Sequence, residues 1–185
     1  MKSRNFAPVL VILGLLLLFS SLARPSDSAL ELLQAIESGN VERVGALLQE
    51  GVDPDTADNA GRTALMYAGI NGQTYSMKML IEKGANVNVE AKRFNGVTPL
   101  IASVIFGDPE AIRLLLRHGA YVNARDRNGE TVLTWAKRRF QTAPPAPSSG
   151  TPNLPGRNQY GGLAFTTKRE LKEVVEILED AGGTE

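Results

Sequence analysis

The side chains that most often catalyse reactions or bind metals are scarce in this chain of 185 residues. It has no cysteine, so disulfide bonds, thiolate catalysis and zinc–thiolate sites are excluded. Its one histidine, His118, lies in the segment L-L-R-H-G-A. A solvent-facing position at a helix end is the favoured interpretation of this histidine, ahead of a catalyst or a metal ligand. The sequence therefore offers no nucleophile with a matching base.

Three aspartates are the other candidate for site chemistry. Asp53, Asp55 and Asp58 have a spacing that suggests calcium ligands. The segment lacks the glycine at the sixth position and the glutamate at the twelfth position of an EF-hand, so an acidic loop is favoured. The pair Gly161–Gly162 follows no strand and does not indicate a phosphate-binding loop. We therefore expect no enzymatic activity, no cofactor and no metal.

A unit of 33 to 35 residues accounts for most of the chain. The fragment T-x-L recurs at Thr63, Thr98 and Thr131. The fragment G-A-x-V-N occurs at 84–88 and again at 119–123, and a degenerate form, G-V-D-P-D, occurs at 51–55. A fixed period of this size predicts stacked supersecondary units.

Each unit has the pattern of two helices joined by a glycine. Thr98 is placed to cap a first helix with its hydroxyl, and Pro99 fits the first helical position. A second helix follows, with apolar residues three and four apart, and ends at another glycine. Asn-Gly in the next polar stretch, at 95–96 and 128–129, reverses the chain. One such pair cannot bury its apolar face alone, so the units must stack. Equivalent buried positions are expected at Leu47, Leu80, Leu115 and Ile177.

These features resemble the ankyrin repeat over about residues 28–182, apart from one insertion. The segments T-P-L at 98–100 and L-L-L-R-H-G-A-Y-V-N-A-R-D-R-N-G at 114–129 are the closest to the family pattern. The resemblance implies an all-α repeat fold, an ankyrin-type solenoid of about four helix–turn–helix repeats with hairpin-like loops. The histidine of the family's T-P-L-H-x-A motif is replaced by Met66, Ile101 and Thr134. Its usual hydrogen bonds to the loop are therefore expected to be absent.

The repeats divide the chain into five parts. Residues 1–23 precede them, and residues 24–61 form an N-terminal capping repeat that begins with the capping-box pattern Ser28-x-x-Glu31. Two further repeats occupy 62–96 and 97–129. The last repeat, 130–182, is interrupted at 141–167 by a Pro/Gly-rich insert that we expect to be flexible. Residues 168–180 are predicted to form its second helix.

Residues 1–23 have the pattern of a secretory signal peptide. Lys2 and Arg4 precede thirteen uncharged residues, 7–19, and small residues follow at Ser21 and Ala23. The alternative is an uncleaved anchor, although the apolar run is shorter than the ~20 residues that a spanning helix needs. Cleavage predicts a periplasmic or secreted protein, and an anchor predicts an inner-membrane protein with its repeats outside. The absence of cysteine and of N-x-S/T sequons favours the bacterial periplasm.

The resemblance also implies a binding surface, formed by the first helices and the loop tips. An aromatic and apolar strip beside arginines has the composition of a protein interface. The alternative is that Ile70, Ile105 and Trp135 pack between repeats. The loop tips also carry Arg62 and Lys92. The expected partner-binding residues are Tyr67, Ile70, Arg93, Phe94, Ile105, Phe106, Arg125, Arg127, Trp135 and Arg138.

Charge is unevenly distributed although the formal net charge is +0. Residues 24–61 carry 2 basic and 8 acidic residues, whereas 62–139 carry 12 basic and 6 acidic ones. Solvated repeat faces are the simplest explanation. We expect an exported, non-catalytic scaffold for a protein partner with an acidic surface. The alternative is a chaperone-like or stress-protection factor that supports a periplasmic enzyme. Nucleic acid is not expected after export, and the membrane is contacted only through an uncleaved N-terminal segment.

Overall fold

The computed structural model describes residues 25–142 and 168–185, apart from the side chains of residues 25, 26, 105 and 106. This part of the chain contains helices, turns and isolated β-bridges, and no strand. The helices come in consecutive pairs: α2 (Pro25–Glu37) with α3 (Val41–Gln49), α4 (Ala64–Ile70) with α5 (Thr74–Glu82), α6 (Pro99–Phe106) with α7 (Pro109–Arg117), and α8 (Val132–Thr142) with α9 (Lys168–Asp180).

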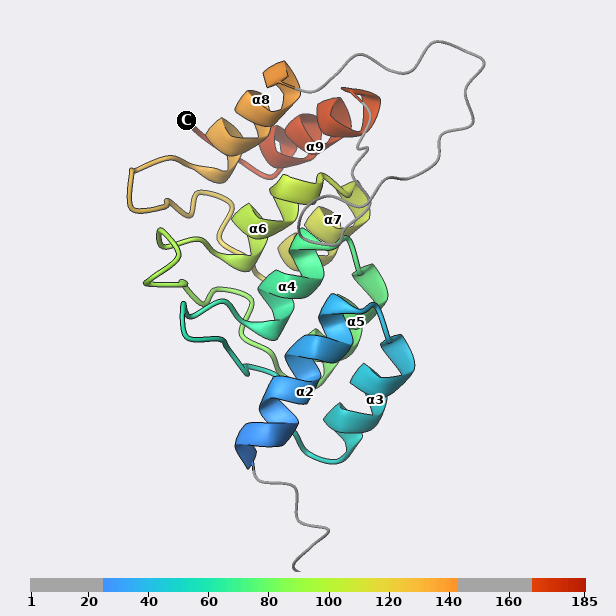
Figure 1. Ribbon diagram of the computed structural model, residues 1–185. Helices are drawn as coiled ribbons and strands as arrows, with labels where there is room; N and C mark the ends of the chain where they lie inside the picture. Colours follow the sequence, from blue (N-terminus) through green and yellow to red (C-terminus); the bar gives the residue numbers. More distant parts are fainter. Residues whose placement is uncertain (1–24, 143–167) are drawn as a thin grey trace, which may run out of the picture.

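The helices form two rows along the long axis of the molecule (Figure 1). One row contains α2, α4, α6 and α8, and the other contains α3, α5, α7 and α9. Each helix packs against the next member of its row and against its own partner. The loops between pairs project on one side of the rows (Figure 1). The predicted all-α solenoid of helix pairs is therefore confirmed for the described residues.

Threonine caps and glycine ends define the first helices, as the sequence predicted. The hydroxyls of Thr63, Thr98 and Thr131 accept hydrogen bonds of 3.3, 3.4 and 3.2 Å from the main-chain nitrogens three residues on. Pro99 stands in the first turn of α6, where its missing N–H has no cost. Gly107 ends this helix at φ 80°, a left-handed conformation that glycine adopts without strain.

The core confirms three of the four equivalent positions and corrects the last. Leu47, Leu80 and Leu115 are fully buried. Ile177 is only partly buried and lines a shallow hollow of about 420 Å³ beside α7. The side chains that α9 buries instead are Leu171, Val174 and Leu178. Leu178 lies four residues before Gly182, just as Leu115 lies four residues before Gly119, so Leu178 holds the equivalent position and the prediction at Ile177 was shifted by one residue. The carbonyl of Leu178 accepts from the N–H of Gly183 at 2.8 Å, and the carbonyl of Leu115 accepts in the same way from Ala120 at 3.0 Å.

The predicted helix at 168–180 is present with those bounds. The insert begins later than expected, because α8 continues through Gln141 to Thr142. The rest of the insert, 143–167, and the proposed signal segment, 1–23, lie outside the described residues. In the described part of the chain, no helix is both long and apolar enough to cross a membrane.

The asparagine of G-A-x-V-N fastens the second repeat to the third and the third repeat to the last. Asn88 donates through Nδ2 to the carbonyl of Gly119 at 2.9 Å and accepts through Oδ1 from the N–H of Tyr121 at 2.9 Å. Asn123 makes the same pair of bonds one repeat later, with Gly182 and Thr184. An amide suits this position because it carries a donor and an acceptor in one side chain.

Candidate protein-binding surface

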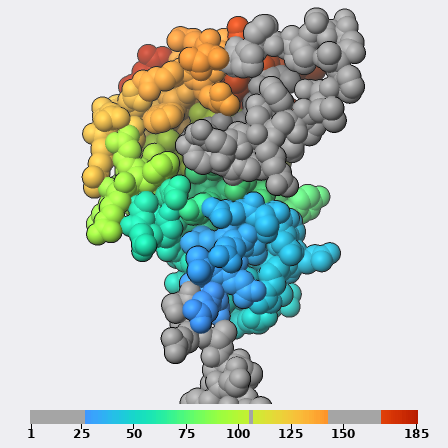
Figure 2. Space-filling view, in the orientation of Figure 1, coloured from blue at the N-terminus to red at the C-terminus, as the bar shows by residue number. Residues whose placement is uncertain are grey.

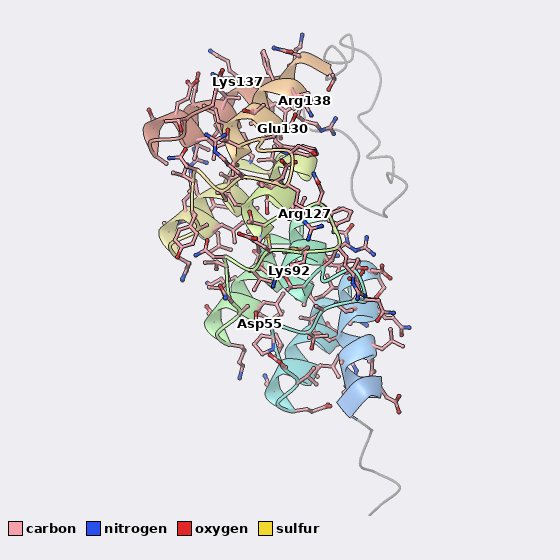
Figure 3. The ribbon with its side chains drawn as sticks, turned by 90° about the vertical axis from the view of Figure 1, so that its left-hand side faces the viewer. Asp55, Lys92, Arg127, Glu130, Lys137 and Arg138 are labelled. Atoms are coloured by element: carbon pink, nitrogen blue, oxygen red, sulfur yellow. The ribbon has the colours of Figure 1, made fainter. Side chains whose placement is uncertain are left out.

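Three hairpins project side by side from the solenoid. Each is closed by one antiparallel β-bridge, and we name them hairpin 1 (57–63), hairpin 2 (91–97) and hairpin 3 (125–131). Figure 3 looks onto this side of the molecule, and Figure 2 shows hairpins 2 and 3 standing out at one edge. The first helices begin directly after the hairpins, so the hairpins and these helices build one continuous surface.

A single carboxylate organises hairpin 1. Asp58 Oδ1 accepts from the main-chain N–H groups of Ala60 and Arg62, both at 2.9 Å. Asp58 Oδ2 accepts from the guanidinium of Arg62 at 2.7 Å and from the hydroxyl of Tyr67 at 3.1 Å. Partial burial acts to raise the pKa of Asp58, but the bonds from Arg62 and Tyr67 outweigh it and hold that pKa below its ordinary value.

Asp126 has the same role in hairpin 3. It is 5% exposed, and its Oδ1 accepts from the N–H groups of Asn128 and Glu130 at 2.8 and 2.9 Å. Its Oδ2 accepts from the indole N–H of Trp135 at 3.3 Å and from the amide of Asn95 at 2.7 Å. The last of these bonds comes from hairpin 2, so Asp126 joins two neighbouring hairpins.

Hairpin 2 combines main-chain hydrogen bonds of its own with side-chain contacts from its neighbours. No carboxylate of the described residues occupies the place of Asp58 or Asp126 in this hairpin. Asn95 adopts φ 54° and its carbonyl accepts from the N–H of Arg127 at 2.9 Å. On the other side, the Arg62 guanidinium lies 5.3 Å from the centroid of the Phe94 ring. A cation at this distance is attracted to the face of the ring.

The expected aromatic strip supports these hairpins. Tyr67, Phe94 and Trp135 are partly buried and pack against the core. Tyr67 and Trp135 donate to the hairpin carboxylates, Asp58 and Asp126. Ile70 is 7% exposed and lies in the core, so its side chain is not on the surface. The side chains of Ile105 and Phe106 fall outside the described part of the structure.

The expected arginines fall into two groups. Arg138 forms an ion pair with Glu130 and lies over the Trp135 ring, 5.8 Å from its centroid. The bond to Glu130 holds the pKa of Arg138 above its ordinary value. The charge of Arg138 is thus already balanced. Arg93, Arg125 and Arg127 are exposed, and none of them forms an ion pair with a side-chain carboxylate of the described residues.

Lys92 joins the second group, and together the four side chains form a cationic ridge: Lys92, Arg93, Arg125 and Arg127. Two of its guanidiniums contact only main-chain oxygens among the described residues. Arg93 donates to Asn59 at 3.2 Å, and Arg125 donates to Gly129 at 2.7 Å. Lys92 and Arg127 lie on neighbouring hairpins along the side seen in Figure 3. The ridge therefore presents four positive charges without acidic partners of its own.

Sequence reasoning missed the anchors of the hairpins. Asp58 was considered only as a calcium ligand, Asn95 only as part of an Asn-Gly turn, and Asp126 was not singled out. A signal was available, because an aspartate stands five residues before the threonine of T-x-L in hairpins 1 and 3. No cluster of three or more potential ligands in the described part of the chain could hold a metal.

Two family models, both described as ankyrin repeats, match residues 17–91 and 80–136. Together they cover more than half of the chain, and the helix pairs and hairpins agree with them. The chain therefore belongs to the ankyrin-repeat proteins. Ankyrin repeats are typically non-catalytic modules that mediate interactions between proteins.

Relatives share the repeats over part of their length. A Rickettsia felis protein described as an ankyrin repeat protein is 35% identical over 95 residues, covering 51% of this chain and 31% of that protein. Protein PhlB of Serratia liquefaciens is 37% identical over 113 residues, covering 60% and 49%. The Arabidopsis thaliana E3 ubiquitin-protein ligase KEG is 35% identical over 112 residues, covering 60% and 7%. The match spans less than half of each of these relatives.

Proposed function

We propose that this protein is a non-catalytic scaffold that binds a protein partner with an acidic surface, and that the cationic ridge is the centre of the contact. The supporting observation is that Lys92, Arg93, Arg125 and Arg127 are exposed on adjacent hairpins without acidic partners among the described residues. Like charges held this close repel one another, and an anionic partner removes that repulsion.

The hairpins suit this task because their positions are set before a partner arrives. Asp126 fixes hairpin 3 and, through Asn95, hairpin 2. A binding surface that is already ordered loses less conformational entropy on association. Guanidinium groups also pair with carboxylates through two parallel hydrogen bonds, which gives direction as well as attraction.

Export is the second part of the proposal. The basic start, the uncharged run and the small residues of 1–23 support a signal peptide and a periplasmic partner. Fusing residues 1–30 to a reporter enzyme that is active only outside the cytoplasm tests this part by itself. We expect reporter activity, and its absence would remove export from the proposal without affecting the ridge.

Affinity capture from the exported fraction, followed by binding kinetics with the captured protein, tests the ridge. Arg127→Glu is compared with Lys78→Glu, which makes the same charge change on the outer helix α5. Because exposed charges mainly steer association, we expect Arg127→Glu to slow association about tenfold at low salt, with less effect at high salt. Lys78→Glu should have little effect. Equal rates for the two variants would show that another surface binds the partner.

A further inference from the structure

An acidic residue of the chain itself lies at the edge of the cationic ridge. The side chain of Glu185 is 2.6 Å from the ammonium of Lys137, measured from Oε1 to Nζ. Arg125 Nη2 donates to the main-chain oxygen of Glu185 at 3.3 Å. The same glutamate lines a hollow of about 250 Å³ with Thr134, Lys137, Arg138 and Gln141. An acidic peptide segment therefore already lies against this part of the surface.

Glu185 is not part of the bond pattern that joins the repeats. That pattern ends at Thr184, whose N–H donates to Asn123 Oδ1 at 2.7 Å. In the preceding repeat, the residue that follows this position is Val122, which packs against the core. Glu185 instead leaves 67% of its side chain exposed. Polar and ionic contacts therefore hold Glu185 in this position, and it makes no packing contact with the core of the described residues that would keep it there.

Lys137 and Arg125 come from separate elements that meet at this point. Lys137 belongs to α8 and Arg125 to hairpin 3, and Lys137 also lies 3.2 Å from Glu179 of α9. The hydrogen bonds that Lys137 donates to Glu185 and Glu179 raise the pKa of Lys137. In Figure 3, Lys137 and Arg138 continue the line of labelled charges beyond Arg127. The glutamate thus occupies the end of the same surface as the ridge.

We propose that Lys137 and Arg125 form a carboxylate subsite for an acidic peptide segment, and that Glu185 occupies this subsite until the partner's carboxylate displaces it. The inference rests on the proposed function, because it names the chemistry that the ridge recognises. The arrangement of Glu185 shows what such a segment offers: a carboxylate for Lys137 and a main-chain oxygen for Arg125.

Glu185 should compete only weakly with a partner's carboxylate for the subsite. An ion pair with this much exposure changes an equilibrium constant by a few-fold at most. The apparent affinity for a partner falls in proportion to the fraction of molecules whose subsite is filled. Glu185 is therefore expected to weaken the binding of an acidic peptide by about two- to fivefold.

The test measures binding of a fluorescein-labelled, amidated hexaglutamate peptide to the full chain by fluorescence anisotropy. Glu185→Gln is compared with Glu176→Gln, which makes the same charge change on α9, where Glu176 lies 3.3 Å from Lys172. We expect Glu185→Gln to tighten binding about two- to fivefold and Glu176→Gln to leave it unchanged. In a Lys137→Gln background, Glu185→Gln should lose its effect.

The outcomes separate the subsite from the ridge. If Lys137→Gln and Arg127→Glu weaken the peptide but Glu185→Gln changes nothing, displacement is wrong and the ridge remains. If none of the ridge variants weakens the peptide, recognition of acidic partners is wrong as well. If a hexathymidine oligonucleotide binds more tightly than hexaglutamate, the assignment of the subsite to a carboxylate peptide is overturned.

Discussion

Hairpins 1 and 3 each contain an aspartate that organises the turn, whereas hairpin 2 has only main-chain hydrogen bonds of its own and takes its side-chain anchors from its neighbours. In the first two, one aspartate accepts main-chain N–H groups of its own turn and an aromatic donor from the following helix. Hairpin 2 contains no such aspartate, and it depends on Asp126 and Arg127 on one side and on Arg62 on the other. The middle hairpin, which carries two of the four ridge cations, therefore depends on its neighbours for its side-chain anchors.

This difference shows how a stack of repeats can vary one unit without losing order. Where a repeat lacks its own anchor, the adjacent repeats provide one, because contacts in a solenoid run mainly between neighbours. The segment from Gly84 to Thr98, which contains hairpin 2, is two residues longer than its counterparts in the neighbouring repeats, although the hairpin itself has the same length as the other two. The consequence is coupling: a change in hairpin 3 should be felt in hairpin 2, and a change in hairpin 1 much less.

A substitution in the core should have the largest effect on the free energy of unfolding, and it gives a reference value for the hairpin variants. Leu115 is fully buried and Ile177 is only partly buried, so Leu115→Ala should lower the free energy of unfolding by ~2–5 kcal/mol. Ile177→Ala should cost clearly less. Chemical denaturation of the two variants measures the difference. Equal losses would mean that α9 buries Ile177 as the other second helices bury their leucines.

Asp126→Ala is the change that should damage the hairpins most. The substitution removes the carboxylate that accepts hydrogen bonds from four donors in and around hairpins 2 and 3. We therefore expect a loss of ~2–4 kcal/mol in unfolding free energy. Asp58→Ala, the matched control, frees donors in and near hairpin 1 alone and should cost less. Nuclear magnetic resonance should show large shifts in hairpin 2 for Asp126→Ala and smaller ones for Asp58→Ala, which reaches hairpin 2 only through the contact of Arg62 with Phe94. Shifts in hairpin 2 of similar size for both variants would contradict the coupling.

Substitutions of Asn95 distinguish the contribution of its hydrogen bond to Asp126 from that of its left-handed backbone conformation. Its φ of 54° favours glycine or asparagine, and its amide donates to Asp126. Asn95→Gly should lose only the hydrogen bond, about 1 kcal/mol, whereas Asn95→Ala should lose about 2 kcal/mol because it also strains the backbone. Thermal unfolding distinguishes these values. A glycine variant no more stable than the alanine variant would show that backbone strain has no part in the effect.

The pH dependence of hairpin 1 should be the smallest effect. Because the pKa of Asp58 is lower in the folded state, its contribution to stability is complete above the ordinary value of 3.8 and disappears as pH falls through the lowered value. The difference in unfolding free energy between the wild type and Asp58→Asn should therefore shrink below about pH 4. A difference that stays constant between pH 6 and pH 3 would contradict the lowered pKa.

Local patterns predicted the repeats well, because each depends on residues close together in the chain. Thr98 caps the helix that begins one residue later, and Gly107 ends it. The anchors of hairpin 2 were not predictable in this way, since Asn95 and Asp126 are 31 residues apart. The helical spacing alone did not fix the register of α9, and counting back from Gly182 places Leu178, not Ile177, at the position of Leu115. The candidate binding residues were chosen from their composition, as aromatic residues beside arginines. The structure adds that Trp135 supports a hairpin from below, whereas Arg127 is exposed.

Hydrogen–deuterium exchange in the presence and absence of the captured partner tests the central claim most directly. The proposal predicts that the partner slows exchange in hairpins 2 and 3, at 91–97 and 125–131, and that α3, α5 and α7 keep their rates. Protection confined to the outer helices, or spread evenly over all described helices, would contradict the assignment of the cationic ridge as the centre of the binding surface.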